Sequence, residues 1–404
     1  MTATDSEHRI VVLGAGYAGL MCAIRVARRT RRHGGTVTLV NPSDRFTERL
    51  RMHQIASGQQ LADLRIPDLI RGSGIAFVRG RAGRIDPDAR TVQLSAEDGG
   101  SRLLHFDTLV YAIGSVADTR DEASVPGAAD HTYTLNDPAA AARIAHRLAE
   151  TPAATVAVCG GGLTGVEAAS EIAEQYPDAR VVLLSRGVPG AAMSAGAREY
   201  LHRALDRLGV RVRAGVEITK VLPGGPELAG GEPVPADITL WTTGFAASPL
   251  AAAAGLAVDP QGRIVVDATL RSVSHPAVYA VGDAAAIRQS WGTIHGTCQS
   301  GIPSAAYAAD AIARRLRGRA AKPFRFGYVH QPVSLGRRDA VIQFTRADDS
   351  PRRWYLTGRL ATRYKEAVTS SPPSTYRLSK RVNVPLAALS ARGGRANRHG
   401  AATG

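Results

Sequence analysis

The sequence predicts an α/β protein whose two main domains share one architecture and are followed by a small α+β segment. A hydrophobic run followed by Gly-x-Gly-x-x-Gly occurs twice, at residues 10–19 and 156–165, and each copy leads into an alanine-rich stretch. Well downstream of each copy, a second hydrophobic run ends in glycine, at residues 106–114 and 238–244. Self-similarity of this kind indicates an internal duplication.

The two glycine patterns predict two dinucleotide-binding turns between a strand and a helix. The first glycine allows a tight turn, and the second lets the backbone approach a pyrophosphate at the helix N-terminus. The third lets the helix pack closely on the strand. One such pattern also serves plain packing, but two copies in the same context favour two dinucleotides, one held permanently and one exchanged. The turn residues expected at the nucleotides are Gly14, Gly16, Ala18, Gly19, Gly160, Gly162, Thr164 and Gly165.

Length and composition favour a soluble globular protein. The 404 residues allow two or three domains, and 44% hydrophobic with 21% charged residues is ordinary for that class. No apolar run reaches the roughly 18 residues that span a bilayer. The first residues lack the order of a signal peptide, so we expect a cytoplasmic protein. Cys22, Cys159 and Cys298 lie far apart without a C-x-x-C motif, which argues against a metal cluster or dithiol.

The formal net charge of +15 raises the question of an anionic partner. The basic residues are mostly arginines without interleaved aromatic residues, and no zinc or helix-turn-helix pattern is present, so we expect no nucleic-acid binding. An acidic partner or peripheral contact with the inner face of a membrane stays open, as does a homodimer.

Changes in pattern divide the chain into five segments. Hydrophobic periodicity fades from Ser371 onward, and no acidic residue follows Glu366. Pro, Gly, Ser and Arg dominate there, and Ser371-Ser-Pro-Pro is expected to break a short amphipathic stretch, which predicts a disordered tail. The predicted segments are 8–150 and 271–325 for the first domain, 151–270 for the second, 326–370 for a C-terminal segment and 371–404 for a basic tail.

The ordered set of motifs resembles the two-dinucleotide flavoprotein reductases of the pyridine nucleotide-disulfide reductase superfamily. Over residues 8–365 the chain is most similar to type II NADH dehydrogenases and apoptosis-inducing-factor-like oxidoreductases. Besides both glycine patterns, the resemblance rests on Ala112-Ile-Gly114, Thr243-Gly244 and Gly282-Asp283. It implies an FAD-binding and an NAD(P)H-binding Rossmann-like domain.

The resemblance implies FAD at the first glycine turn. Asn41 stands where the fingerprint usually has an acid for the ribose, and an asparagine still offers hydrogen bonds there. Asp283 is expected at the ribityl chain and Ala82 near the adenine. The Arg51 guanidinium is a candidate partner for a phosphate, although a plain surface arginine explains it equally well.

The second turn would bind NAD(P)H. Ser185 and Arg186 replace the acid that would bind a ribose 2′-hydroxyl, and they suit a 2′-phosphate, so we expect a preference for NADPH over NADH. The resemblance places Glu167 beside the nicotinamide and the flavin, where it would orient the hydride donor. The alternative is a first-turn glutamate that favours the helix dipole.

The stretch from Thr297 to Pro303 departs from the family. Type II NADH dehydrogenases have a glutamine-rich A-Q-x-x-x-Q pattern here, and this chain keeps one glutamine, Gln299, which we take as a catalytic candidate. The helix N-terminus in this stretch would stabilise negative charge on the reduced flavin. Cys298 as a redox thiol, and His53 or His295 as acid–base groups, are weaker alternatives to structural roles.

The predicted function is an FAD-dependent oxidoreductase that moves a hydride from NAD(P)H to the flavin and then electrons to a quinone-like or other small acceptor. One alternative is a flavoenzyme of the same fold that acts on a specialised biosynthetic metabolite. Another is a non-catalytic flavoprotein that regulates a partner, against which the intact second glycine turn with Glu167 argues.

Overall fold

The computed structural model describes residues 7–95, 99–119, 125–386 and 390–391. Its first half is a five-stranded sheet in the order β18-β7-β1-β2-β3, and all neighbouring strands are parallel. Since β18 comes from far along the sequence, the chain leaves this sheet, builds the second domain and returns. The strands are β1 (His8–Leu13), β2 (Gly35–Asn41), β3 (Ile75–Arg79), β7 (Thr108–Tyr111) and β18 (Val278–Ala280).

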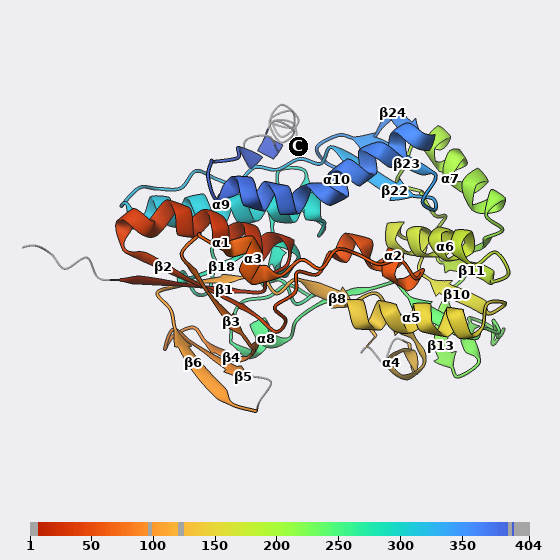
Figure 1. Ribbon diagram of the computed structural model, residues 1–404, viewed down its shortest axis with the longest axis horizontal. Coiled ribbons are helices and arrows are strands. Elements are labelled where there is room, and N and C mark those ends of the chain that lie inside the picture. Colours follow the sequence, from red (N-terminus) through yellow and green to blue (C-terminus); the bar gives the residue numbers. More distant parts are fainter. Residues whose placement is uncertain (1–6, 96–98, 120–124, 387–389, 392–404) are drawn as a thin grey trace, which may run out of the picture.

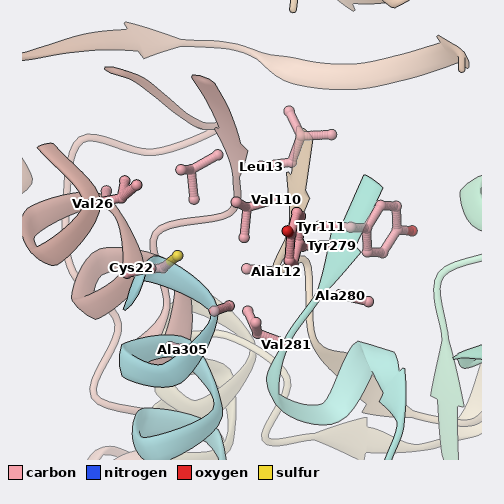
Figure 2. Close-up of a cluster of buried hydrophobic side chains, with 14 of the residues drawn as sticks. Leu13, Cys22, Val26, Val110, Tyr111, Ala112, Tyr279, Ala280, Val281 and Ala305 are labelled. Atoms are coloured by element: carbon pink, nitrogen blue, oxygen red, sulfur yellow. The ribbon is translucent and has the colours of Figure 1, made fainter. Parts of the chain in front are cut away.

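Two long helices, α1 (Tyr17–Thr30) and α9 (Cys298–Leu316), lie side by side on one face of this sheet (Figure 1). Toward the other face lie α8 (Leu250–Ala253) and an antiparallel sheet of β4 (Arg81–Asp86), β5 (Thr91–Ser95) and β6 (Ser101–His105) (Figure 1). Small residues of α9 let it approach α1 closely, and Ala305 lies in the same buried cluster as Cys22 and Val26 of α1 (Figure 2). The Cys22 thiol is buried in this cluster.

The second half repeats the architecture in a sheet of order β12-β11-β10-β15-β9 with parallel neighbours. Cys159 ends its central strand and is buried. The two parallel sheets confirm the predicted α/β fold, while the exact segment boundaries stay predictions. The elements are β9 (Tyr133–Thr134), β10 (Thr155–Cys159), β11 (Arg180–Ser185), β12 (Arg211–Ala214), β15 (Ile238–Trp241), α5 (Pro138–Glu150), α6 (Leu163–Gln175) and α7 (Ala195–Arg207).

Two short strands connect the halves. β8 (Ser115–Ala117) follows Gly114, and β16 (Phe245–Ala247) follows Gly244, so the same position in each duplicated unit gives rise to a connecting strand. They pair antiparallel with each other, and β8 lies between the halves in Figure 1.

Shorter elements complete the two halves. Among the described residues, no helix combines the length and the apolar character needed to cross a bilayer. The shorter elements are α2 (Met52–Ala56), α3 (Ile66–Ile70), α4 (Ala128–His131), β13 (Ile218–Leu222), β14 (Gly225–Leu228), β17 (Ile264–Val265), β19 (Ala285–Ala286), β20 (Arg288–Gln289) and β21 (Gly292–Thr293), with 3-10 turns at Arg31–His33, Arg49–Arg51 and Gly282–Ala284.

The C-terminal part is an antiparallel sheet followed by a long helix, as the α+β expectation requires. β22 (His330–Ser334), β23 (Ala340–Thr345) and β24 (Pro351–Thr357) lie beside the second domain, and α10 (Gly358–Ser379) runs back across α1 (Figure 1).

The predicted break at Ser371-Ser-Pro-Pro is wrong, because α10 continues through Pro372 and Pro373 to Ser379. Prolines inside a helix remove backbone donors and usually destabilise it. Here the helix keeps one buried face at intervals of three and four residues, and Tyr376 on that face is fully buried. Its ring packs edge-on against Phe46, which offsets the loss. Of the predicted tail, residues 387–389 and 392–404 lie outside the described residues.

Candidate functional site

Both glycine turns have the same local geometry. Gly14 and Gly160, which follow the buried strands β1 and β10, have φ angles of +95° and +122°, a region that favours glycine. A Cβ on Gly19 would lie 1.8 Å from the Gly14 carbonyl oxygen, and a Cβ on Gly165 equally 1.8 Å from that of Gly160. Only glycine therefore permits these helix–strand contacts.

The second glycine of each turn faces open space. A Cβ on Gly16 or Gly162 would meet no atom within 4 Å in the described part of the chain. Each turn thus leaves backbone N–H groups accessible at a helix N-terminus, which is what a pyrophosphate requires. The residues present fit a dinucleotide at both turns.

A first cavity extends from the Gly14 turn. Asn41 lines it, but the Asn41 side chain also stabilises the turn, accepting from the Ala15 N–H at 3.0 Å and donating to the Ser43 carbonyl at 2.7 Å. The Asp283 carboxylate accepts a hydrogen bond from the Ser115 hydroxyl at 3.0 Å. The expected FAD residues that line this cavity are Gly14, Gly16, Ala18, Asn41, Gly114, Gly282 and Asp283.

Three residues expected at FAD are not among those that line the first cavity: Gly19, which packs against the Gly14 carbonyl, and Ala82 and Arg51. Ala82 lies in β4 opposite Leu94. Arg51 is engaged by the carboxylates of Glu48 and Glu366. The neighbouring Arg49 lines the cavity instead and donates to the Ser115 carbonyl at 2.5 Å. The sequence Arg49-Leu50-Arg51 does not show which of the two arginines faces the cavity.

A second cavity lies at the Gly160 turn. Ser185 ends β11, and its hydroxyl is so close to the turn that a Cβ on Gly161 would lie 2.2 Å from it. Arg186 follows at the surface. The expected nucleotide residues that line this cavity are Gly160, Gly162, Ser185, Arg186 and Gly244.

The two cavities meet. Trp241, Thr242 and Phe245 line both of them, so the turn after β15 forms their common wall. The Trp241 indole N–H donates to the Asp118 carbonyl at 3.0 Å, which fixes the ring at this position. Thr164, expected at the second nucleotide, lines the first cavity. The start of α6 therefore faces the region where the cavities join.

Glu167 also lines the first cavity from α6, and its carboxylate is held by two groups of the C-terminal part. It accepts from the Ser334 N–H at 3.0 Å and forms an ion pair with Lys365 of α10. Burial lowers the pKa of the Lys365 ammonium to about 7. A partly buried carboxylate with a buried cation of low pKa forms an acid–base pair beside the cavity.

Gln299 does not line the cavity. Its amide nitrogen donates to the His330 carbonyl at 2.9 Å, and its amide oxygen accepts from the Val329 N–H at 2.6 Å. Both ends of the side chain are thus used to attach α9 to the start of β22. The catalytic candidate Gln299 is in a structural position, and the proximity of β22 was not visible in the sequence.

The N-terminus of α9 reaches the first cavity through Thr297 and Cys298. Thr297 and Ser300 form a reciprocal capping box that fixes the start of the helix, and the backbone N–H groups of Cys298 and Gln299 face the Cys298 sulfur. Burial raises the pKa of the Cys298 thiol to about 11, so the thiol is neutral at physiological pH and is not an activated nucleophile.

The two candidate histidines lie in different surroundings. His53 of α2 is buried and lines the first cavity. His295 is exposed, stacks on the Tyr328 ring at 4.3 Å and lies 3.2 Å from the Asp349 carboxylate, which is a surface arrangement. Only His53 is placed to act at the site.

The sequence profile of the pyridine nucleotide-disulphide oxidoreductase family matches residues 8–311. The chain belongs to this family. The match includes both glycine turns and the return strand β18, so it covers the elements that form both cavities.

The chain is 31% identical over 354 residues to an NADH dehydrogenase-like protein of Mycobacterium tuberculosis, covering 82% of this chain and 87% of that protein. It is 28% identical to a demethylphylloquinone reductase of Synechocystis, covering 84% and 87%. The fold is similar to that of NDH2 from Plasmodium falciparum in complex with NADH, with a TM-score of 0.78 at 14% identity, covering 93% and 97%. These findings confirm an oxidoreductase that uses FAD and a nicotinamide nucleotide.

Proposed function

We propose that this protein transfers electrons from NADPH or NADH to a quinone through FAD. The observation that carries the proposal is the common wall of the two cavities, Trp241, Thr242 and Phe245. Two dinucleotides held at the two glycine turns would meet there with their redox rings. FAD, when bound, supplies the chemistry that links a hydride donor to an electron acceptor. Relatives named as quinone reductases support a quinone as the acceptor.

Glu167 is proposed to orient the nicotinamide. Its carboxylate lines the first cavity and is held by Ser334 and Lys365, so a hydrogen bond to the carboxamide would be directed from a fixed group. The N-terminus of α9, where the positive end of the helix dipole lies, is proposed to stabilise negative charge that develops in the first cavity.

Ser185 and Arg186 are proposed to favour NADPH. Both line the second cavity, Ser185 as the last residue of β11 and Arg186 directly after it, where the adenosine ribose of a bound nucleotide would lie. A hydroxyl donor and an exposed guanidinium fit a 2′-phosphate, and neither repels it.

A peripheral contact with an anionic membrane is proposed for the face formed by β24 and the start of α10. Trp354 and Leu360 are 78% and 68% exposed there, and Arg353 and Arg359 stand beside them in sequence. An aromatic and an aliphatic anchor with flanking arginines is the combination that binds the interface of anionic lipids. Sedimentation with anionic and with neutral vesicles tests this contact, which we expect to be weakened by Trp354→Ser and by salt.

Anaerobic addition of NADPH or NADH to the purified FAD-loaded protein tests the proposed function. We expect bleaching of the flavin absorbance and steady turnover with menadione, with a lower KM for NADPH. Bleaching without turnover on any quinone would contradict the acceptor, whereas flavin that stays oxidised with both nucleotides would contradict the redox assignment.

A further inference from the structure

A pocket lined by arginines lies at the end of the first domain that is remote from the redox cavities. Helices α1 and α9 run side by side in the same direction (Figure 1). Their starts, at Tyr17 and Cys298, line the first cavity, and at their other ends the Arg317 guanidinium donates to the Arg29 carbonyl at 3.0 Å. The arginine pocket at this other end has a volume of about 240 Å³ and is lined by Arg28, Arg29, Arg31, Arg32, Arg317 and Asn383.

The fold, and not only a basic run in the sequence, assembles this pocket. The end of α1 and the following turn supply four of its arginines, the residue after α9 supplies the fifth, and the segment after α10 supplies Asn383. The Asn383 amide oxygen accepts a hydrogen bond from the Arg28 guanidinium. Next to it, the Val384 carbonyl accepts from Arg25 at 2.7 Å. The segment after α10 is thereby attached to α1 and closes one side of the pocket.

The arginine pocket has a large surplus of positive charge. Asp310 pairs with Arg29, but the same carboxylate also forms two hydrogen bonds with Arg25. Among the residues that the structure describes, the other four guanidiniums of the lining have no ion-pair partner. The negative end of a helix dipole favours cations only within its last turn, and like charges at close range repel one another. A bound anion would remove this repulsion.

Most hydrogen-bond donors of these arginines are available to a ligand. A guanidinium carries five N–H donors. In the described part of the chain, Arg28, Arg29 and Arg317 each use one donor, toward Asn383, Asp310 and the Arg29 carbonyl. The side chains of Arg31 and Arg32 use none there. The contacts that do exist hold three of the guanidiniums in place, which lowers the entropy cost of binding an anion.

We propose that the arginine pocket is a binding site for a small anion with two linked phosphoryl groups, of which inorganic pyrophosphate is the simplest. Guanidiniums pair with phosphoryl oxygens through two parallel hydrogen bonds. A single phosphoryl group has too few free oxygens to pair with five guanidiniums, whereas two linked groups have about twice as many. The volume of the pocket suits a ligand of this size and excludes a folded macromolecule.

The position of the pocket makes its ligand distinct from the nucleotides of the redox site. The 14 residues of α1 separate the arginine pocket from the first glycine turn by about 20 Å. An anion there cannot contact the first cavity and takes no part in hydride transfer. Its effect is to join the ends of α1 and α9 to the segment after α10. The proposal is therefore independent of the electron acceptor.

Isothermal titration calorimetry of the FAD-loaded protein with inorganic pyrophosphate, at constant ionic strength and without divalent cations, tests the proposal. We expect pyrophosphate to bind about tenfold more tightly than inorganic phosphate, because it engages more guanidiniums. Joint substitution by Arg31→Gln and Arg32→Gln should weaken pyrophosphate binding about tenfold or more. The matched control is Arg84→Gln with Arg102→Gln, which removes the same charge from exposed positions of β4 and β6.

The second glycine turn is the main competing site for pyrophosphate. Binding that survives the two substitutions at Arg31 and Arg32 but is lost in Gly165→Val would place the anion at that turn and overturn the proposal. An equal loss in the control pair would reduce the effect to overall charge and would also overturn it. So would the absence of pyrophosphate binding, including the case in which Arg31 and Arg32 are needed instead for binding to vesicles that contain phosphatidylglycerol.

Two further measurements keep the test valid if the double arginine variant folds poorly. Asn383→Ala should weaken pyrophosphate binding by a smaller factor of about threefold, because it releases Arg28. Hydrogen–deuterium exchange should slow at residues 380–386 when pyrophosphate binds to the wild-type protein, since the ligand would hold Asn383 and its neighbours against α1. Exchange in this segment that is the same with and without saturating pyrophosphate would overturn the placement of the anion in the arginine pocket.

Discussion

The two glycine turns are nearly identical in backbone and differ in what surrounds them. In each turn, a Cβ on the third glycine would lie 1.8 Å from the carbonyl oxygen of the first glycine. Two residues further on, however, α1 has Met21, which is fully buried in the core, and α6 has Glu167, which lines the first cavity. The two copies thus share the glycine turn and differ in the following helix turn, where one has an apolar and the other an acidic side chain.

The surroundings also differ in how many parts of the chain contribute. Residues from α2, α6, α9 and both connecting strands line the first cavity, whereas the lining of the second comes mainly from its own domain. A ligand enclosed by so many distant segments is expected to stay bound, and one held by a single domain is expected to exchange. The two glycine turns therefore have similar backbones, but their nucleotides are expected to stay bound for different times.

The largest predicted effect comes from substitutions that place a side chain in one glycine turn at a time. Gly19→Val should yield protein without FAD, and Gly165→Val should keep FAD but lose bleaching by NADPH. In both, a side chain would overlap a carbonyl oxygen, with an overpacking cost of about 1–3 kcal/mol or more. Flavin content and anaerobic absorbance spectra give the result. Gly224→Ala, where a Cβ would meet open space, is the control.

The next largest effect concerns the ion pair of Glu167, the acidic residue of α6 that replaces Met21 of α1. Lys365→Met should lower the free energy of unfolding by up to about 3 kcal/mol, because it leaves the partly buried Glu167 carboxylate without its cation. Urea unfolding measures this loss. The double variant with Glu167→Gln should recover a large part of it, and a double variant no more stable than the single one would show that the ion pair is not the cause.

Specificity of the second cavity gives a smaller effect. Arg186→Glu should raise the KM for NADPH about tenfold, since a carboxylate would repel the 2′-phosphate that the guanidinium is proposed to bind. The KM for NADH should change little. Steady-state kinetics with both nucleotides test this, and equal changes for the two would argue against a 2′-phosphate site at Arg186.

The smallest predicted effect is on stability, at an aspartate that has an ion-pair partner in the first parallel sheet but not in the second. Asp107 and Asp237 occupy matching positions, accepting from the Arg9 and Thr155 N–H groups at 2.8 Å each. The Arg9 guanidinium also pairs with Asp107, and this hydrogen bond lowers the pKa of Asp107 to about 2. Asp107→Asn should therefore cost about 0.2–1 kcal/mol more than Asp237→Asn at neutral pH.

The pH dependence of that difference has a defined sign. A carboxyl whose pKa is lower in the folded state stabilises the fold above its unfolded pKa of about 3.9. The extra stability of Asp107 should fade as the pH falls from about 4 toward 2. Thermal unfolding of both variants across this range measures it, and a difference that persists at pH 2 would contradict the ion-pair explanation.

Sequence patterns predicted what depends on local backbone rules. The glycines of both turns, Asp283 and the fold class follow from spacing that a strand–turn–helix unit imposes. They could not predict partners brought together by the fold, such as Lys365 at Glu167. The choice between Arg49 and Arg51, and the engagement of Gln299 by β22, likewise depend on packing between segments far apart in sequence. The helix through Pro372 formed because burial of Tyr376 outweighs a strong local signal.

The strands β8 and β16 set a limit on how the two halves can move. Because they are hydrogen-bonded to each other along Ser115–Ala117 and Phe245–Ala247, neither can bend alone. Two connecting strands that are hydrogen-bonded to each other resist rotation of one domain against the other and allow only a small bending between them. Nucleotide exchange in this protein should then proceed with the domains almost stationary, through the open mouth of the second cavity.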